Sequence, residues 1–195
     1  TLSLHEALPI SHVALTVTTG RPTALVDDLI ADRFDVVLTP AVYKQLPPGI
    51  TRTVLVHDSI GLFCGDTHPL AAQAAPDPAA LGACDWINIG IASPFQDEER
   101  DFLQRNGIQR PHTRFATVND AAVLMAVLRQ GRHLAVLPRL PARLIDGGRG
   151  LHEIALPSGP APRDVMLWCR ESVADQPAVR GLRELALALV ASPPS

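Results

Sequence analysis

Cys64, Asp66 and His68 are the residues of this sequence whose types and spacing most suggest chemistry. In an extended segment, residues two apart share one face, so a thiol, an acid and a base could form a nucleophilic site or hold a metal ion. Two nearby glycines and the proline after His68 favour another interpretation, because glycine and proline interrupt regular structure where a chain turns. We therefore interpret this segment as a structural crossover.

An acidic cluster and several scattered histidines are the remaining candidates for chemistry. Asp97, Glu98, Glu99 and Asp101 fall on one expected helix, and we interpret them as its solvated N-terminal face, which suits the helix dipole. The histidines form neither H-x-x-x-H nor H-x-H, so no zinc site is expected. The sequence has no G-x-S-x-G elbow, P-loop or G-x-G-x-x-G. We predict no enzyme, no metal site and no cofactor.

The stretch from Thr117 to Pro138 predicts a capped helix, a tight turn and a buried strand in succession. Thr117 and Asp120 resemble a capping box, and Asn119 is an alternative cap. Gly131 suits the left-handed position at the helix end. This order favours a parallel sheet, in which helix N-termini face one crevice, so Asn119 and Asp120 would border a ligand site. A plain packing unit is the alternative.

The other elements are predicted from alternation, helical spacing and turn residues. Helices are expected to start at Pro22, after Asp77, and at Ser93-Pro94, where Ser93 and Gln96 resemble a capping box and Gly107 ends the helix. A closing helix is expected over 177–190. Strands are expected at 13–18, 35–38, 53–56, 60–64, 86–89, 134–137, 151–155 and 165–169, with a further short strand that ends at 115–116.

Composition sets bounds on the class of protein. The chain has 195 residues, 47% of them hydrophobic and 19% charged, which is enough for one large domain or two packed lobes. A net charge of −3 and a single lysine, Lys44, argue against a nucleic-acid-binding surface in this chain. Cys64, Cys84 and Cys169 form no C-x-x-C pair, and no long apolar run is present. We expect reduced thiols and a cytoplasmic protein.

Three segments together resemble a known family. The run L-R-Q-G-R-H-L-A-V-L-P resembles the V-x-x-G-x-G-I-A-x-L-P pattern of the regulatory domain of LysR-type transcriptional regulators, with His133 in place of the second glycine. Gly20–Leu38 and Gly61–Ala71 match two further family signatures in the expected order. The resemblance implies an α/β fold of periplasmic-binding-protein type 2, with two lobes joined by two crossovers and an effector in the cleft. It also implies an upstream winged helix-turn-helix that binds DNA.

The resemblance also implies how the chain is divided. Residues 12–64 and 165–195 would form lobe I and residues 65–164 lobe II, with crossovers near Gly61–Gly65 and Gly159–Leu167. Residues 1–11, TLSLHEALPIS, join abruptly to the strand expected at Val13. We interpret them as an artefactual leader or as a remnant of the family's first helix, so the first strand and helix of the fold are expected to be missing.

Effector contacts can be assigned through the resemblance. By position they would be Gly20, Arg21, Thr39 and Pro40 in lobe I, and Ile91, Ala92, Ser93, Asn119 and Asp120 in lobe II. Some dicarboxylate-binding regulators of the family carry arginine where Pro40 stands. The sequence therefore favours a small monocarboxylate or aromatic metabolite. Ser93 and Asn119 are equally suited to plain helix capping.

The function that the resemblance implies is an effector-sensing domain of a LysR-type regulator. A type 2 solute-binding protein without a transcriptional role is the alternative, and an enzyme on the same topology is a third. The resemblance further implies a homodimer or homotetramer in which the 22–32 helix of one subunit packs on the 119–130 helix of another. Val26 and Ile30, or Val123 and Val127, would supply the exposed apolar stripe.

Overall fold

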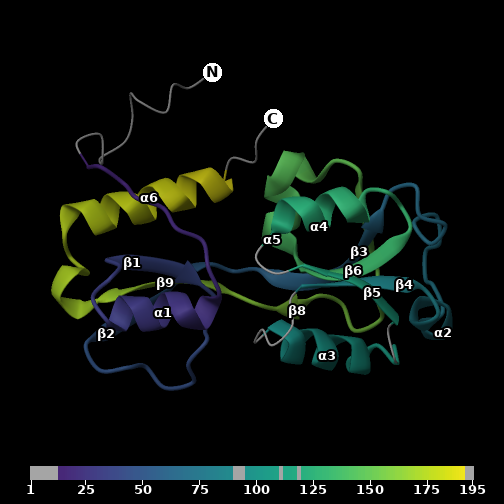
Figure 1. Ribbon diagram of the computed structural model, residues 1–195, viewed down its shortest axis with the longest axis horizontal. Helices are drawn as coiled ribbons and strands as arrows, with labels where there is room; N and C mark the ends of the chain where they lie inside the picture. Colours follow the sequence, from purple (N-terminus) through teal and green to yellow (C-terminus); the bar gives the residue numbers. More distant parts are fainter. Residues whose placement is uncertain (1–12, 90–94, 110–111, 118–119, 192–195) are drawn as a thin grey trace. The chain divides into compact units, whose positions relative to one another are not determined.

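The chain folds into two compact units in this computed structural model, which describes residues 13–89, 95–109, 112–117 and 120–191 (Figure 1). Unit 1 takes its described residues from 13–57 and 164–191, and unit 2 from 58–163. The chain passes from one unit to the other at 57–58 and at 163–164. The boundaries predicted from the sequence are 64–65 and 164–165. Strand β3 (Ser59–Gly65) lies in unit 2 because its partners β6 (His133–Pro138) and β7 (Leu151–Ile154) are there.

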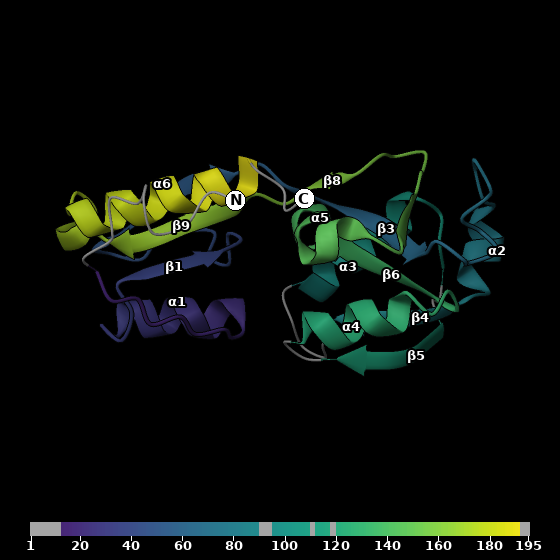
Figure 2. The same cartoon turned by 90° about the horizontal axis from the view of Figure 1, so that it is seen from above.

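Unit 1 is a three-stranded antiparallel sheet between two helices. The strand order is β1-β9-β2, with β1 at Val36–Thr39, β9 at Val165–Arg170 and β2 at Ile50–Val56. Helix α1 (Pro22–Ile30) covers one face and α6 (Pro177–Ala191) the other (Figures 1 and 2). Each face has its own core. One contains Val26, Leu29, Val37, Ile50 and Trp168, and the other Leu55, Leu167, Cys169 and Val179.

The predicted strand over 13–18 is wrong. These residues form no strand, and Val13 and Val17 are 39% and 84% exposed. Alternation identifies a strand only when a neighbouring strand completes its ladder, and none pairs with this segment in the described chain. The stripe assigned to α1 also needs correction: Val26 is buried and unavailable to a partner, whereas Ile30 is 46% exposed.

Unit 2 is a mixed sheet with helices on both faces. Strands run in the order β5-β4-β6-β3-β7, with β5 at His112–Thr117 and β4 at Asp85–Ile89, and β8 (Ala161–Pro162) pairs with β3. The expected parallel pairing holds for β5-β4-β6, but β3 runs antiparallel to its neighbours. Helix α3 (Phe95–Arg105) covers one face, and α4 (Ala121–Leu128) and α5 (Arg139–Leu144) the other (Figure 1).

Of two short helices in unit 2, one was predicted from the sequence and the other was not. Helix α2 (Pro78–Gly82) starts as predicted, because the Asp77 carboxylate accepts a hydrogen bond from the Ala79 N–H at 3.1 Å. Helix α5 was missed, since its cap is remote in sequence: the buried Asp58 carboxylate accepts the Leu140 N–H at 3.0 and 3.2 Å. No described helix is both long and apolar enough to span a bilayer.

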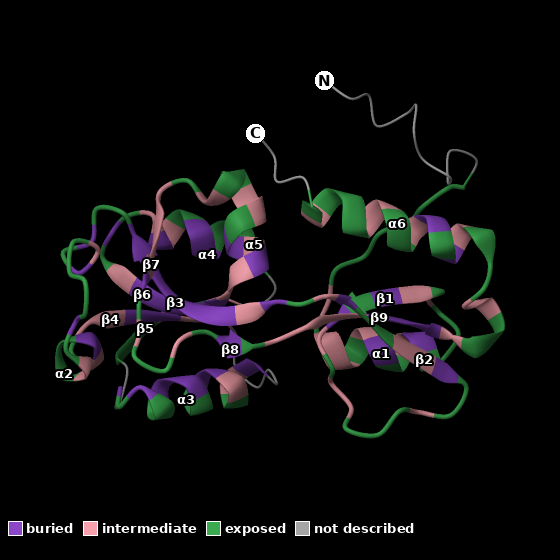
Figure 3. Ribbon diagram, turned by 180° about the vertical axis from the view of Figure 1, so that it is seen from behind, coloured by how far each residue is buried: buried purple, intermediate pink, exposed green. Residues whose placement is uncertain are grey.

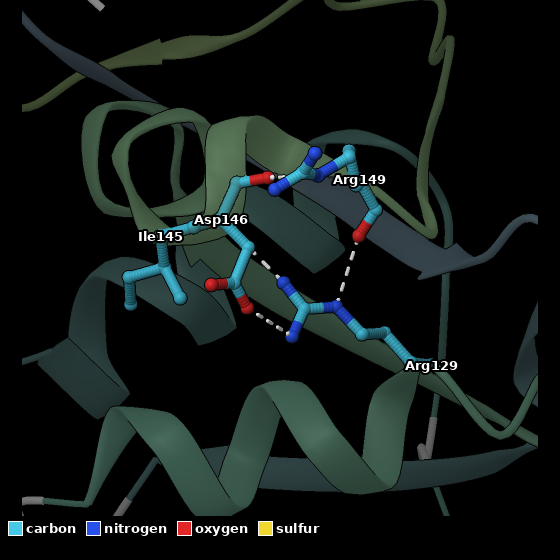
Figure 4. Close-up of polar contacts among 4 residues, drawn as sticks. All are labelled: Arg129, Ile145, Asp146 and Arg149. Carbon is cyan, nitrogen blue, oxygen red and sulfur yellow. Dashed lines mark hydrogen bonds and ion pairs between the residues drawn. The ribbon is translucent and has the colours of Figure 1, made fainter. Parts of the chain in front are cut away.

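A polar cluster fixes the loop between α5 and β7 (Figure 4). The loop includes a 3-10 turn (Ile145–Gly148) in which Asp146 has a φ of 51°. From the end of α4, Arg129 donates through Nε to the Arg149 carbonyl at 2.9 Å and through Nη1 to the Asp146 carboxylate at 2.8 Å. One guanidinium therefore braces both sides of a loop held in an uncommon backbone conformation.

Candidate functional site

The predicted contacts of unit 1 lie where α1 begins and where β1 ends. The chain enters α1 at the same end of the unit to which the β1 arrow points (Figure 1). Arg21 is the N-cap residue of α1 but makes no side-chain capping bond, Pro22 follows it, and the first turn has no acidic residue. The first N–H groups of α1 are therefore not satisfied by a cap or by an acidic side chain, which is the arrangement that accepts an anionic or acceptor group. Gly20 precedes this turn and is half-buried.

Thr39 is the most informative residue at the end of β1. It is 3% exposed, and its Oγ1 has no hydrogen-bond partner among the described residues. Its carbonyl accepts the Trp168 Nε1–H at 3.2 Å, which holds the strand end against the core. A buried hydroxyl without a partner costs stability, and a hydrogen-bonding group that reached this oxygen would offset that cost. Pro40 follows and is half-buried.

In unit 2, only Asp120 of the predicted contacts can be placed, because Ile91, Ala92, Ser93 and Asn119 lie outside the described residues. Asp120 is itself the N-cap of α4, and its Oδ1 accepts the Val123 N–H at 2.9 Å. The capping box led by Thr117 is therefore wrong, since Thr117 is the last residue of β5. A carboxylate that already satisfies this helix start disfavours a second anion there.

Cys64, Asp66 and His68 have the character of structural residues. Burial raises the pKa of the Cys64 thiol to about 11, with smaller contributions from Cys84 and Asp66, so the reactive thiolate is disfavoured. The buried Nδ1 of His68 accepts the Leu70 N–H at 3.1 Å, and desolvation lowers the His68 pKa. Within the described parts of the chain, no three acidic, histidine or cysteine side chains are grouped to hold a metal ion.

The acidic cluster on α3 contains a residue that the sequence interpretation misplaced. Glu99 is not on a solvated face: it is 6% exposed and is buried, as are Phe95 and Phe102 of the same helix. Figure 3 shows α3 with one buried and one exposed side. The sequence contains a pattern that indicates this burial, because residues 95, 99 and 102 are spaced to lie on one face of a helix. Desolvation raises the Glu99 pKa to about 7. Glu98, by contrast, accepts the Arg163 Nε–H at 2.6 Å.

Comparison with known proteins connects this arrangement to one family. Residues 10–191 match the family described as LysR substrate binding domain. The fold is similar to the reduced regulatory domain of OxyR from Pseudomonas aeruginosa, at 16% identity and a TM-score of 0.65 over 86% of this chain and 79% of that one. It is also similar to the effector binding domain of QuiR in complex with shikimate, at 16% identity and a TM-score of 0.65 over 87% and 78%.

A third solved structure is the regulatory domain of MetR, a LysR family regulator from N. meningitidis, at 16% identity and a TM-score of 0.58 over 84% and 73%. At a sequence identity of 16%, the similarity to these three structures is evidence for the fold alone. No curated protein is significantly similar to the chain in sequence.

Proposed function

We propose that this chain, which belongs to the LysR substrate binding domain family, senses a small-molecule effector on behalf of a transcriptional regulator. The observation that carries the proposal is the family match over residues 10–191, supported by the fold shared with regulatory and effector-binding domains. The family match favours a regulator over a solute receptor. DNA binding would belong to a separate winged helix-turn-helix domain of the intact regulator.

The polar groups of each unit support an effector with at most one carboxylate. In unit 1, the α1 N-terminus and Arg21 favour one anionic group, and the unpartnered Thr39 hydroxyl suits a hydroxyl or carboxylate oxygen. In unit 2, Asp120 opposes a second negative charge. QuiR is solved with shikimate, a hydroxylated monocarboxylate, which makes shikimate and benzoate suitable first probes.

The test is calorimetric titration of a monocarboxylate panel, begun with shikimate and benzoate, against the chain and its Thr39→Val variant. Loss of one hydrogen bond to a charged group should weaken binding by about ten- to a hundredfold. The isosteric substitution should leave stability unchanged or improved, because it removes a buried hydroxyl without a partner. Equal affinity of both proteins would remove Thr39 from the site, and failure of the whole panel would refute the monocarboxylate assignment.

Thr51→Val is the matched control in the same sheet. The Thr51 hydroxyl donates to the Cys169 carbonyl at 3.2 Å, so its removal leaves that carbonyl short of a partner. This variant should lose about 1 kcal/mol of stability and keep its affinity. The two valine variants thus separate a ligand contact from a structural hydroxyl.

Self-association and location are further parts of the proposal. Ile30 on α1 and Val123 on α4 are 46% and 42% exposed, which supports pairing of these helices between two copies in a homodimer. Sedimentation of Ile30→Glu should show a shift toward monomer. The free thiols Cys64, Cys84 and Cys169 are compatible with a cytoplasmic regulator.

A further inference from the structure

A pocket of about 440 Å³ lies inside unit 2, beside α3. Its polar lining includes Asn88 from β4 and Glu99 from α3, and its apolar lining includes Leu103 from α3 and Ile108 from the turn after it. Gly107 makes that turn possible with a φ of +69°. None of these residues is among the proposed effector contacts.

Two residues that line this pocket carry oxygen acceptors for which the described residues provide no partner. Glu99 is only 6% exposed, and no hydrogen bond or ion pair reaches its carboxylate from the described residues. The Oδ1 of Asn88 is fully buried and likewise lacks a partner among them. A protein interior normally pairs such groups, because an unmet carboxylate or amide oxygen is costly to desolvate. Two of them on separate elements, beside one pocket, indicate a missing donor.

The charged groups nearby do not supply that donor. Arg100 is the other charged residue lining the pocket, but it is 67% exposed and its Nη2 donates to Asp97 at 2.6 Å. The neighbouring Arg163 is taken by Glu98. The remaining polar lining consists of the glutamines 96, 104 and 109. Glu99 is therefore the one acidic group in the described lining, and its charge is uncompensated.

We propose that this pocket binds a small organic monocation, a primary ammonium group carried on a short apolar chain. The ammonium donates to the Glu99 carboxylate and to Asn88 Oδ1, and the apolar chain packs on Leu103 and Ile108. The lining offers a single carboxylate, whereas Ca²⁺ and Mg²⁺ take about six oxygen ligands and are held mainly by carboxylates. An ammonium needs only partners for its three N–H donors. Arg100 at the rim disfavours a second positive charge on the ligand.

Ammonium binding should depend on pH through Glu99. The site needs the carboxylate, and burial holds its pKa at about 7. Protons therefore compete with the ligand below that pH, and affinity should rise about tenfold between about pH 6 and about pH 8. Arg100 is the only other charged group in the described lining.

The experiment is calorimetric titration of the chain with n-pentylamine hydrochloride, compared with pentan-1-ol and pentanoate. Saturable binding of the ammonium is expected, with weaker binding of the alcohol and none of the carboxylate. Glu99→Gln should weaken ammonium binding by about ten- to a hundredfold and abolish its pH dependence. Asn88→Leu, which removes the second acceptor, should weaken it independently.

Asp101→Asn is the matched control, because it removes one exposed carboxylate from the same helix outside the pocket lining. It should leave affinity unchanged. The proposal would be overturned if pentylamine did not bind, or if pentan-1-ol bound as tightly as pentylamine. It would also be overturned if folded Glu99→Gln and Asn88→Leu bound pentylamine as tightly as the wild type does. These outcomes do not bear on the monocarboxylate effector, which is tested with different ligands and with Thr39→Val.

Discussion

Replacing Glu99 by glutamine should stabilise the chain relative to wild type by an amount that grows as pH rises from about 4.5 to about 7. Folding raises the Glu99 pKa from 4.5 to about 7 by desolvation, so between these values the folded state binds more protons than the unfolded state. Stability contributed by the neutral carboxyl is therefore lost as pH rises through this window. A pKa unit corresponds to about 1.36 kcal/mol, so full ionisation lowers the free energy of unfolding by about 3 kcal/mol.

Glutamine preserves the shape of Glu99 but does not titrate. Urea unfolding of both proteins, followed by tryptophan fluorescence, should show a stability difference that grows by about 3 kcal/mol from about pH 4 to about pH 8 in favour of Glu99→Gln. Asp101→Asn is the matched control on the same helix, because that side chain is exposed and its replacement should not reproduce this stabilisation. A pH-independent difference between wild type and Glu99→Gln would refute the burial of an unpaired carboxylate on α3.

Substitutions at Gly65, Asp58 and Arg129 test how unit 2 is held together. Gly65→Ala places a Cβ 2.7 Å from the Leu128 carbonyl oxygen, so urea unfolding should show that the free energy of unfolding falls by about 1 to 3 kcal/mol. Gly159→Ala is the control and should cost less, because its φ is +66° but no atom lies within 4 Å of the added Cβ. Asp58→Ala removes the cap of α5 and should cost about 1 to 3 kcal/mol by the same measurement, with Asp58→Asn intermediate. Arg129→Lys should speed amide exchange at 146–150 by roughly fivefold, since lysine cannot bridge both sides of the loop, and an unchanged rate would refute the bracing role.

Sequence predicted the elements of this fold well where local signals agree with tertiary packing. Helix α1 begins at the predicted Pro22, α2 has the predicted Asp77 cap, and the strand around Trp86 lies at β4. Local signals failed where a distant partner decides. The cap of α5 is 82 residues away in sequence, so no window around Leu140 contains it. The alternating segment at 13–18 has no pairing strand among the described residues.

The site was harder to predict than the fold, because residue type was given more weight than residue position. A run of acidic residues suggested a solvated face, yet Glu99 lies four residues after Phe95 and three before Phe102, on the apolar stripe. Thr117 suggested a helix cap, yet β5 extends through it and shifts the cap to Asp120. Helical phase for Glu99 was available from the sequence, whereas the end of β5 depends on pairing with β4.

Each unit contains buried polar groups that lack a hydrogen-bond partner among the described residues, and these groups lower its stability. Thr39 in unit 1 and Asn88 in unit 2 have buried oxygens without described partners, and the residue Glu99, which lines the same pocket as Asn88, is buried. Apolar residues at those positions would pack without a desolvation cost. A ligand that donates to such a group recovers that cost and also stabilises the folded state by RT ln(1 + [L]/Kd). Each ligand should therefore protect mainly the unit that holds its acceptor. Amide hydrogen exchange should slow in unit 1 when a monocarboxylate is added and in unit 2 when an ammonium is added, and this result would assign the two sites independently. If the ammonium slowed exchange only in unit 1, the placement of its site beside α3 would be contradicted.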